Sequence, residues 1–182
     1  MIFATVGTQL PFDRLLHAVD TWAGAHAEVK VIAQIGETEQ VFAHMTCRES
    51  IAQDEFREMF EQAEVIVGHA GMGTILTASE LGKPVVIMPR LARHGEHRTD
   101  HQLATTAEMS RLGNVFVADG PENVAAQIDS ALASAGDMGQ TLGTDASPEL
   151  VQALQKFVRS AVADRKGLDL SGLPPVDSVE LG

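Results

Sequence analysis

Short runs of almost wholly apolar residues alternate along this chain with segments that carry apolar side chains at helical spacing. The apolar runs occupy residues 1–6, 29–35, 65–67, 85–88 and 115–117, and 40–47 is interpreted as a further strand. The helical patterns occupy residues 13–22, 54–64, 73–81, 100–110 and 122–133. Strands that are apolar throughout are typical of sheets covered on both faces, and strand–helix alternation favours parallel order. The sequence therefore predicts an α/β fold, a parallel sheet with helices on both faces.

The 182 residues, 45% of them hydrophobic, suffice for one domain with a tail. We expect the domain to span residues 1–135, followed by a flexible connector rich in glycine, serine and threonine at 136–146. Residues 147–166 form a predicted helix, which opens with a serine, a proline and an acid, and 167–182 is an extended tail. The apolar face of this helix packs either on its own domain or on a partner.

Charge and composition exclude several classes of function. A net charge of −12 argues against nucleic-acid binding and against adsorption to an anionic membrane. The single cysteine, Cys47, cannot form an internal disulfide and suits a reducing compartment. No run approaches the roughly 18 apolar residues of a membrane span, and the first residues lack a basic leader. We therefore expect a cytoplasmic protein, which would need a partner to work at a membrane.

The stretch HAGMGT, residues 69–74, lies where a strand pattern ends and a helix pattern begins. A helix N-terminus presents unpaired N–H groups and a partial positive charge, and glycines allow a phosphate to approach the backbone. The Thr74 hydroxyl and the His69 imidazole add side-chain donors. These residues predict a cradle for a diphosphate. The alternative is an ordinary tight turn, and the spacing of Gly71 and Gly73 is not the dinucleotide-binding fingerprint.

A second polar stretch, RLARHGEHRTDHQ, covers residues 90–102 after the predicted strand that ends near Pro89. It concentrates arginines and histidines in an otherwise acidic chain. Arg90, Arg93 and Arg98 are candidates for contacts with phosphate or carboxylate groups. The alternative is a solvated loop that ends in an aspartate helix cap.

The end of the same stretch, Asp100 to Gln102, offers donors and acceptors that suit sugar hydroxyls. Its histidines at 94, 97 and 101 also have the spacing of metal ligands on a helix. The arginines beside them disfavour a cation, so no metal site is predicted.

These motifs resemble a known family. HAGMGTI, ELGKP and MPR…GEHRTDHQ, in this order and spacing, are similar to the nucleotide-sugar-binding half of GT-B glycosyltransferases, in particular glycosyltransferase family 28. The opening MIFATVGTQLPFDRLLHAVD is similar to small Alg13-like proteins, and the later motifs most resemble PssE-type subunits of exopolysaccharide synthesis. The resemblance covers about residues 1–117 and implies a single Rossmann-like GT-B half-domain.

The resemblance also implies roles for individual residues. The donor nucleotide-sugar would be bound by Gly7, Thr8, His69, Gly71, Met72, Gly73, Thr74, Thr77, Arg90, Asp100, His101 and Gln102. Of these, His69 and Thr74 would act in catalysis by stabilising the leaving diphosphate.

One position departs from the family pattern. Many relatives have a ribose-binding glutamate eight positions after the histidine, where this chain has Thr77. Either Thr77 makes a weaker ribose contact, or Glu80 takes the role, or Glu80 is a solvated helix residue.

The function implied is that of a donor-binding subunit of a UDP-sugar-dependent inverting hexosyltransferase. It would transfer a hexose or hexuronic acid to a lipid-linked acceptor in extracellular polysaccharide biosynthesis, without metal or other cofactor. A general base is not identifiable, because Asp13 is interpreted as a helix cap and His17 lies within a helix. A membrane-anchored Alg14- or PssD-like partner would supply the acceptor site and hold the chain at the inner face of the membrane. The alternatives are a non-catalytic nucleotide-sugar scaffold or sensor and an epimerase-like enzyme.

Overall fold

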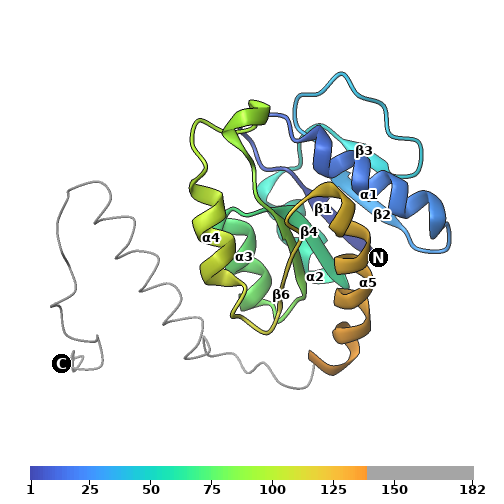
Figure 1. Cartoon of the computed structure of the whole chain (residues 1–182). Coiled ribbons are helices and arrows are strands. Elements are labelled where there is room, and N and C mark those ends of the chain that lie inside the picture. The colour runs from blue at the N-terminus through green and yellow to red at the C-terminus, as the bar shows by residue number, and fades with distance from the viewer. Residues whose placement is uncertain (139–182) are drawn as a thin grey trace, which may run out of the picture.

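The computed structural model describes residues 1–138, which form a six-stranded sheet between two layers of helices (Figure 1). The strands are β1 (Ile2–Thr5), β2 (Val31–Gln34), β3 (Thr46–Arg48), β4 (Val65–His69), β5 (Val85–Met88) and β6 (Val115–Val117). The helices are α1 (Asp13–Ala25), α2 (Gln53–Gln62), α3 (Met72–Glu80), α4 (His101–Met109) and α5 (Pro121–Met138), with a short 3-10 turn, η1 (Ala92–His94).

All neighbouring strands are parallel, in the order β3-β2-β1-β4-β5-β6. This confirms the predicted α/β, Rossmann-like sheet with helices on both faces. The strand order reverses direction between β1 and β4, so the loops that follow these two strands diverge to opposite sides. In open α/β sheets this is the point where a crevice forms at the carboxyl ends of the strands.

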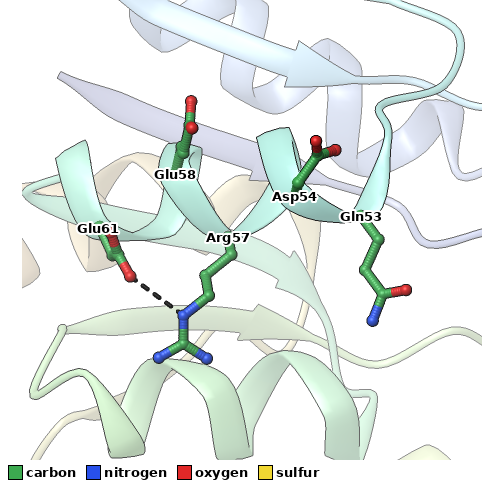
Figure 2. A pocket seen from close by; sticks show the side chains of 5 residues that line it. All are labelled: Gln53, Asp54, Arg57, Glu58 and Glu61. Atoms are coloured by element: carbon green, nitrogen blue, oxygen red, sulfur yellow. Dashed lines mark hydrogen bonds and ion pairs between the residues drawn. The ribbon is translucent and has the colours of Figure 1, made fainter.

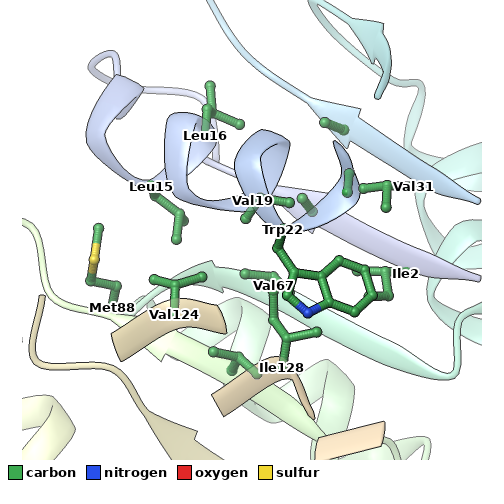
Figure 3. Close-up of a cluster of buried hydrophobic side chains, with 14 of the residues drawn as sticks. Ile2, Leu15, Leu16, Val19, Trp22, Val31, Val67, Met88, Val124 and Ile128 are labelled. Atoms are coloured by element: carbon green, nitrogen blue, oxygen red, sulfur yellow. The ribbon is translucent and has the colours of Figure 1, made fainter. Parts of the chain in front are cut away.

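Two apolar cores explain why the strands are apolar throughout. Alternate residues of one strand enter different cores: Ile2 and Ala4 face the layer of α1 and α5, whereas Phe3 faces that of α2, α3 and α4. Figure 3 shows the first core, where Trp22 of α1 and Ile128 of α5 converge over the sheet. Because each strand buries both its faces, its sequence shows no polar alternation.

The strand predicted at residues 40–47 is wrong in its position, since β3 occupies only Thr46–Arg48. The preceding residues are held on α1 instead of in the sheet. The backbone N–H groups of Ala43 and His44 donate to the Asp20 carboxylate, and Phe42 is buried beside the His17 ring. Side-chain anchors on α1 therefore keep this segment as a loop.

Two helix boundaries also differ from those predicted. Asp13 is not a cap but the first residue of α1, and its carboxylate accepts a hydrogen bond from the Thr38 hydroxyl at 2.7 Å. The last helix, α5, runs to Met138, five residues beyond its predicted end at 133 and into the predicted connector. The rest of that connector, the predicted helix at 147–166 and the tail at 167–182 lie outside the described residues. Within residues 1–138 no helix has the length and hydropathy needed to cross a membrane.

Candidate functional site: a cleft at the reversal of strand order

A cleft of about 370 Å³ lies where the loops after β1, β3, β4 and β5 meet beside the end of β2. It brings together seven of the residues singled out in the sequence: Gly7, Thr8, His69, Gly71, Arg90, His101 and Gln102. It is also lined by Val6, Gln9, Gln34, Ser50, Ile51, Phe56 and His97. The carboxyl edge of the sheet thus gathers side chains from five separate segments into one site.

The His69 imidazole lies between two glycines at the floor of this cleft. A Cβ atom on Gly71 would approach the imidazole Nε2 to 2.2 Å, and one on Gly7 would approach Cε1 to 2.8 Å. Gly7 also has a φ of +75°, which other residues rarely adopt. Both positions therefore require glycine for the ring to lie where it does.

The imidazole is incompletely hydrogen-bonded. Among residues 1–138, Nδ1 of His69 is the buried side-chain polar atom that has no partner. Burial, together with the smaller effects of the Arg90 and His97 charges, lowers the pKa of His69 to about 4. The ring is therefore neutral at physiological pH. If Nδ1 has no partner, burying its lone pair costs less free energy than burying an N–H there without an acceptor. We therefore expect the proton on Nε2.

The N-terminus of α3 lies directly after His69 and carries no side-chain cap. Its first backbone bond runs from the Ile75 N–H to the Gly71 carbonyl, so the preceding helical N–H groups have no intrahelical acceptor. Gly73 faces open space, since an added Cβ would meet nothing within 4 Å. Thr74, in contrast, is 93% buried beside Gly68. Met72, Gly73, Thr74 and Thr77 all lie on α3 and do not line the cleft itself.

Arg90 lines the cleft but directs its guanidinium into the protein. It is 2% exposed, and its N–H groups donate to the carbonyl oxygens of Val6, Pro11 and Glu96. Burial lowers its pKa to about 10, although Glu96 opposes this shift, so it remains a cation at neutral pH. The Arg90 guanidinium therefore does not point into the cleft, contrary to its predicted contact with a phosphate or carboxylate group.

The sugar-binding candidates at residues 100–102 separate in space. Gln102 is buried and accepts a hydrogen bond from the Arg90 N–H, which leaves its amide NH₂ for a ligand. Asp100 is exposed, lies outside the cleft lining, and accepts from the Ala92 N–H at 2.7 Å. His101 is exposed at the rim, and burial followed by the nearby His97 lowers its pKa.

The other members of this loop do not form a metal site. No group of three or more histidine, cysteine or acidic side chains in residues 1–138 is placed to bind a metal ion. Arg93 and Arg98 are exposed, and Arg93 contacts His94.

Thr77 and Glu80 occupy different environments on α3. Thr77 is half-buried, whereas Glu80 is at the end of the helix, 64% exposed and paired with Arg57 at 3.6 Å. The interpretation of Glu80 as a solvated helix residue agrees with this position.

Several residues of the cleft were not among the candidates predicted from the sequence. Gln34, a polar residue at the end of an apolar strand, is buried, and its amide donates to the Gly7 and Glu49 carbonyls. Ser50, Ile51 and Phe56 form another wall of the cleft. Ser50 and Ile51 were missed because the third strand was predicted at the wrong residues. Gln34 could have been found from its place at the strand end.

A larger concave surface, about 580 Å³, lies along α2 and is lined by Gln53, Asp54, Arg57, Glu58 and Glu61. Figure 2 shows these side chains spread along one helix, with Arg57 paired to Glu61. All five residues belong to α2 and none lies at the carboxyl edge of the sheet, so this surface is a solvated helix face.

A family model links this architecture to sugar transfer. The glycosyltransferase family 28 C-terminal domain matches residues 1–147. The chain belongs to this family. The cleft is therefore the candidate functional site of this family 28 domain. No curated protein sequence matches the chain.

Solved structures support the fold of the family 28 domain. It is similar to the glycotransferase of kitacinnamycin (20% identity, TM-score 0.53, 90% of this chain and 40% of that one). It is also similar to MurG of Acinetobacter baumannii (18%, 0.52, 85% and 49%) and to a putative UDP-N-acetylglucosamine 2-epimerase of Listeria monocytogenes (11%, 0.57, 92% and 45%). The chain thus spans less than half the length of these proteins.

Proposed function

We propose that this chain is the donor-binding part of a UDP-sugar-dependent inverting glycosyltransferase. It transfers a hexose or hexuronic acid to a lipid-linked acceptor in extracellular polysaccharide biosynthesis, together with a membrane-bound partner. The observation that carries the proposal is the neutral His69 imidazole, held between Gly7 and Gly71 beside the uncapped start of α3.

The donor diphosphate rests on the first N–H groups of α3 and accepts a hydrogen bond from His69. Negative charge grows on this diphosphate as the bond to the sugar breaks, so fixed donors there lower the barrier. Gly73 supports this role because nothing lies within 4 Å of the place that its Cβ would occupy. Thr74 adds its hydroxyl only if its buried side chain turns toward the ligand, so we assign it the smaller effect.

The remaining walls suit the rest of a nucleotide-sugar. Ile51 and Phe56 offer an apolar surface for a base, and the Gln102 amide and His101 offer donors for sugar hydroxyls. Arg93 and Arg98 are exposed nearby in sequence and would recognise a uronate carboxylate or an acceptor phosphate. The acceptor and the general base come from the partner, which holds the chain at the cytoplasmic face of the membrane.

The epimerase-like alternative has less support. Enzymes of that kind need carboxylates in the cleft for proton transfer, and none of the described residues that line this cleft is acidic. A non-catalytic sensor remains the competing proposal, because it would bind the same ligand.

Calorimetric titration of the chain with UDP, UDP-glucose, UDP-galactose, UDP-GlcNAc and UDP-glucuronate tests the proposal. We expect binding of UDP, with affinity reduced about tenfold or more in His69→Ala, because a hydrogen bond to a charged group contributes about 1.5–3 kcal/mol. Arg57→Gln on α2 is the matched control and should bind like the wild type.

Absence of UDP binding, or equal binding by His69→Ala, would count against the cradle. An assay of sugar transfer by the complex of this chain with its partner distinguishes an enzyme from a sensor. Loss of transfer in His69→Ala, with the complex intact, excludes the sensor. A selective loss of UDP-glucuronate binding in Arg93→Ala would identify a uronate donor.

A further inference from the structure

We infer that Arg90 is a positioning residue, whose buried guanidinium clasps the β1–α1 loop to the β5–α4 loop and so fixes the spacing of two cleft walls. The identity of the ligand in the cleft rests on the proposed function. The clasp depends only on contacts within the structure. We define the clasp as Arg90 with Phe12, Arg14 and Glu96.

The guanidinium reaches both ends of the loop after β1 and the loop after β5. Its Nη2 donates to the Val6 carbonyl at 2.6 Å, and its Nη1 donates to those of Pro11 at 2.9 Å and Glu96 at 3.0 Å. Val6 directly precedes Gly7 of the cleft. A planar fork with several fixed donors can hold three acceptors at once, which a lysine ammonium on a flexible stem cannot reproduce.

A second connection reinforces the first. The Glu96 carboxylate, 6% exposed, accepts two hydrogen bonds from Arg14 at 2.9 Å and one from the Leu91 N–H at 3.0 Å. Arg14 also donates to the Pro89 carbonyl at 3.0 Å. The start of α1 is thereby attached to the same β5–α4 segment at two points, Pro89 and Glu96.

The Phe12 ring completes the clasp. The Arg90 guanidinium carbon lies 4.7 Å and that of Arg14 5.5 Å from its centroid, within the range of cation–π attraction. Phe12 is fully buried, so these contacts are shielded from solvent. Arg90 and Glu96 are thus buried beside Phe12, and Arg14 is partly buried with 18% of its side chain exposed.

The clasp reaches the ligand by position and by charge. Gly7 and Thr8 are on one of its loops, and His101 and Gln102 immediately follow the other. The Arg90 charge acts on His69 at the cleft floor, where it helps to keep the imidazole neutral. A diphosphate in the cleft would feel this same positive charge without touching the guanidinium.

The test compares Arg90→Lys with Arg57→Lys, on the exposed face of α2, in the full chain. We expect amide hydrogen exchange at residues 7–12 and 91–99 to accelerate together, by about tenfold, in Arg90→Lys and to stay unchanged in Arg57→Lys. UDP affinity should fall about tenfold in the first variant only. Ile128→Ala, on the buried face of α5, is the control for lowered stability and should change neither readout.

If Arg90→Lys does not fold, Glu96→Gln gives a milder version, because it loses the charge pair with Arg14 but keeps an oxygen for the Leu91 N–H. We then expect the same joint acceleration and loss of affinity, each about threefold. Unchanged exchange overturns the clasp, and faster exchange with unchanged UDP affinity overturns its positioning role. Failure of the wild type to bind UDP would defeat the proposed function, whereas loop exchange would still decide the clasp.

Discussion

The turn after β4 and the loop after β5 are neighbours at one edge of the sheet, and both look like anion sites in the sequence. In the structure they differ in how far their polar groups are already paired. The turn after β4 leaves Nδ1 of His69 without a partner and α3 without a cap. The loop after β5 pairs Arg90 and Glu96 inside the protein. Unpaired polar groups, more than charged residue types, therefore mark the place for a ligand.

The largest expected contrast between the two regions is in the pH dependence of stability. His69 has a pKa of about 4 in the folded chain, against 6.5 in an unfolded one, so unfolding takes up a proton between these values. The wild type should lose about 3 kcal/mol of stability relative to His69→Gln as the pH falls from 6.5 to 4.

Glu96 should behave differently. Burial raises the pKa of its carboxyl, but hydrogen bonds from Arg14 and the Leu91 N–H, and the Arg14 charge, outweigh this and lower it. Its stabilisation is therefore complete above the usual carboxyl pKa and is lost as the pH falls through the lowered one. Urea midpoints should show Glu96→Gln less stable than the wild type at pH 7, with the difference shrinking as the pH falls toward 3.5. Identical profiles for His69→Gln and the wild type would contradict this picture.

A pair of glycine substitutions should sharpen the comparison through ligand affinity. In Gly71→Ala the new methyl would displace the imidazole, so UDP affinity should fall about 10- to 100-fold, the value of a hydrogen bond to a charged group. In Gly95→Ala the new methyl meets nothing within 4 Å, but the φ of +69° costs about 1 kcal/mol. Gly95→Ala should thus lower the melting temperature and leave UDP affinity unchanged. The reverse pattern in calorimetry would place the ligand at the β5–α4 loop.

The smallest effect concerns the proposed ribose contact of Thr77. Thr77→Val should weaken UDP binding about two- to tenfold, as expected for the loss of one neutral hydrogen bond. Glu80→Gln should leave it unchanged, because Glu80 is exposed and paired with Arg57. Competition titrations with uridine and with uracil, which differ by the ribose alone, would resolve this difference. A larger effect at Glu80 would transfer the ribose role to it.

Much of the fold was predictable because it depends on local patterns. The runs at residues 65–67 and 85–88 are strands of the central sheet, as predicted, since burial on both faces requires apolar residues at every position. The third strand was misplaced because residues 40–45 are held by α1, through Asp20, rather than by their own pattern.

For the candidate site, the sequence located the corner at His69 and the glycines around it. Helix N-termini and glycines contact ligands through backbone groups, so the order of residues along the chain is enough to predict where these groups lie. The sequence could not indicate that Gln34 would fix the Gly7 loop, because that contact joins two strands.

The sequence by itself determined the layered α/β fold and the presence of an open helix start after β4. Only the tertiary structure decided which polar residues are free to meet a ligand. Arg90 bonds to Val6, 84 positions away, and Arg14 to Glu96, 82 positions away. Pairing of this kind depends on how distant segments pack, and no local pattern of residues encodes it.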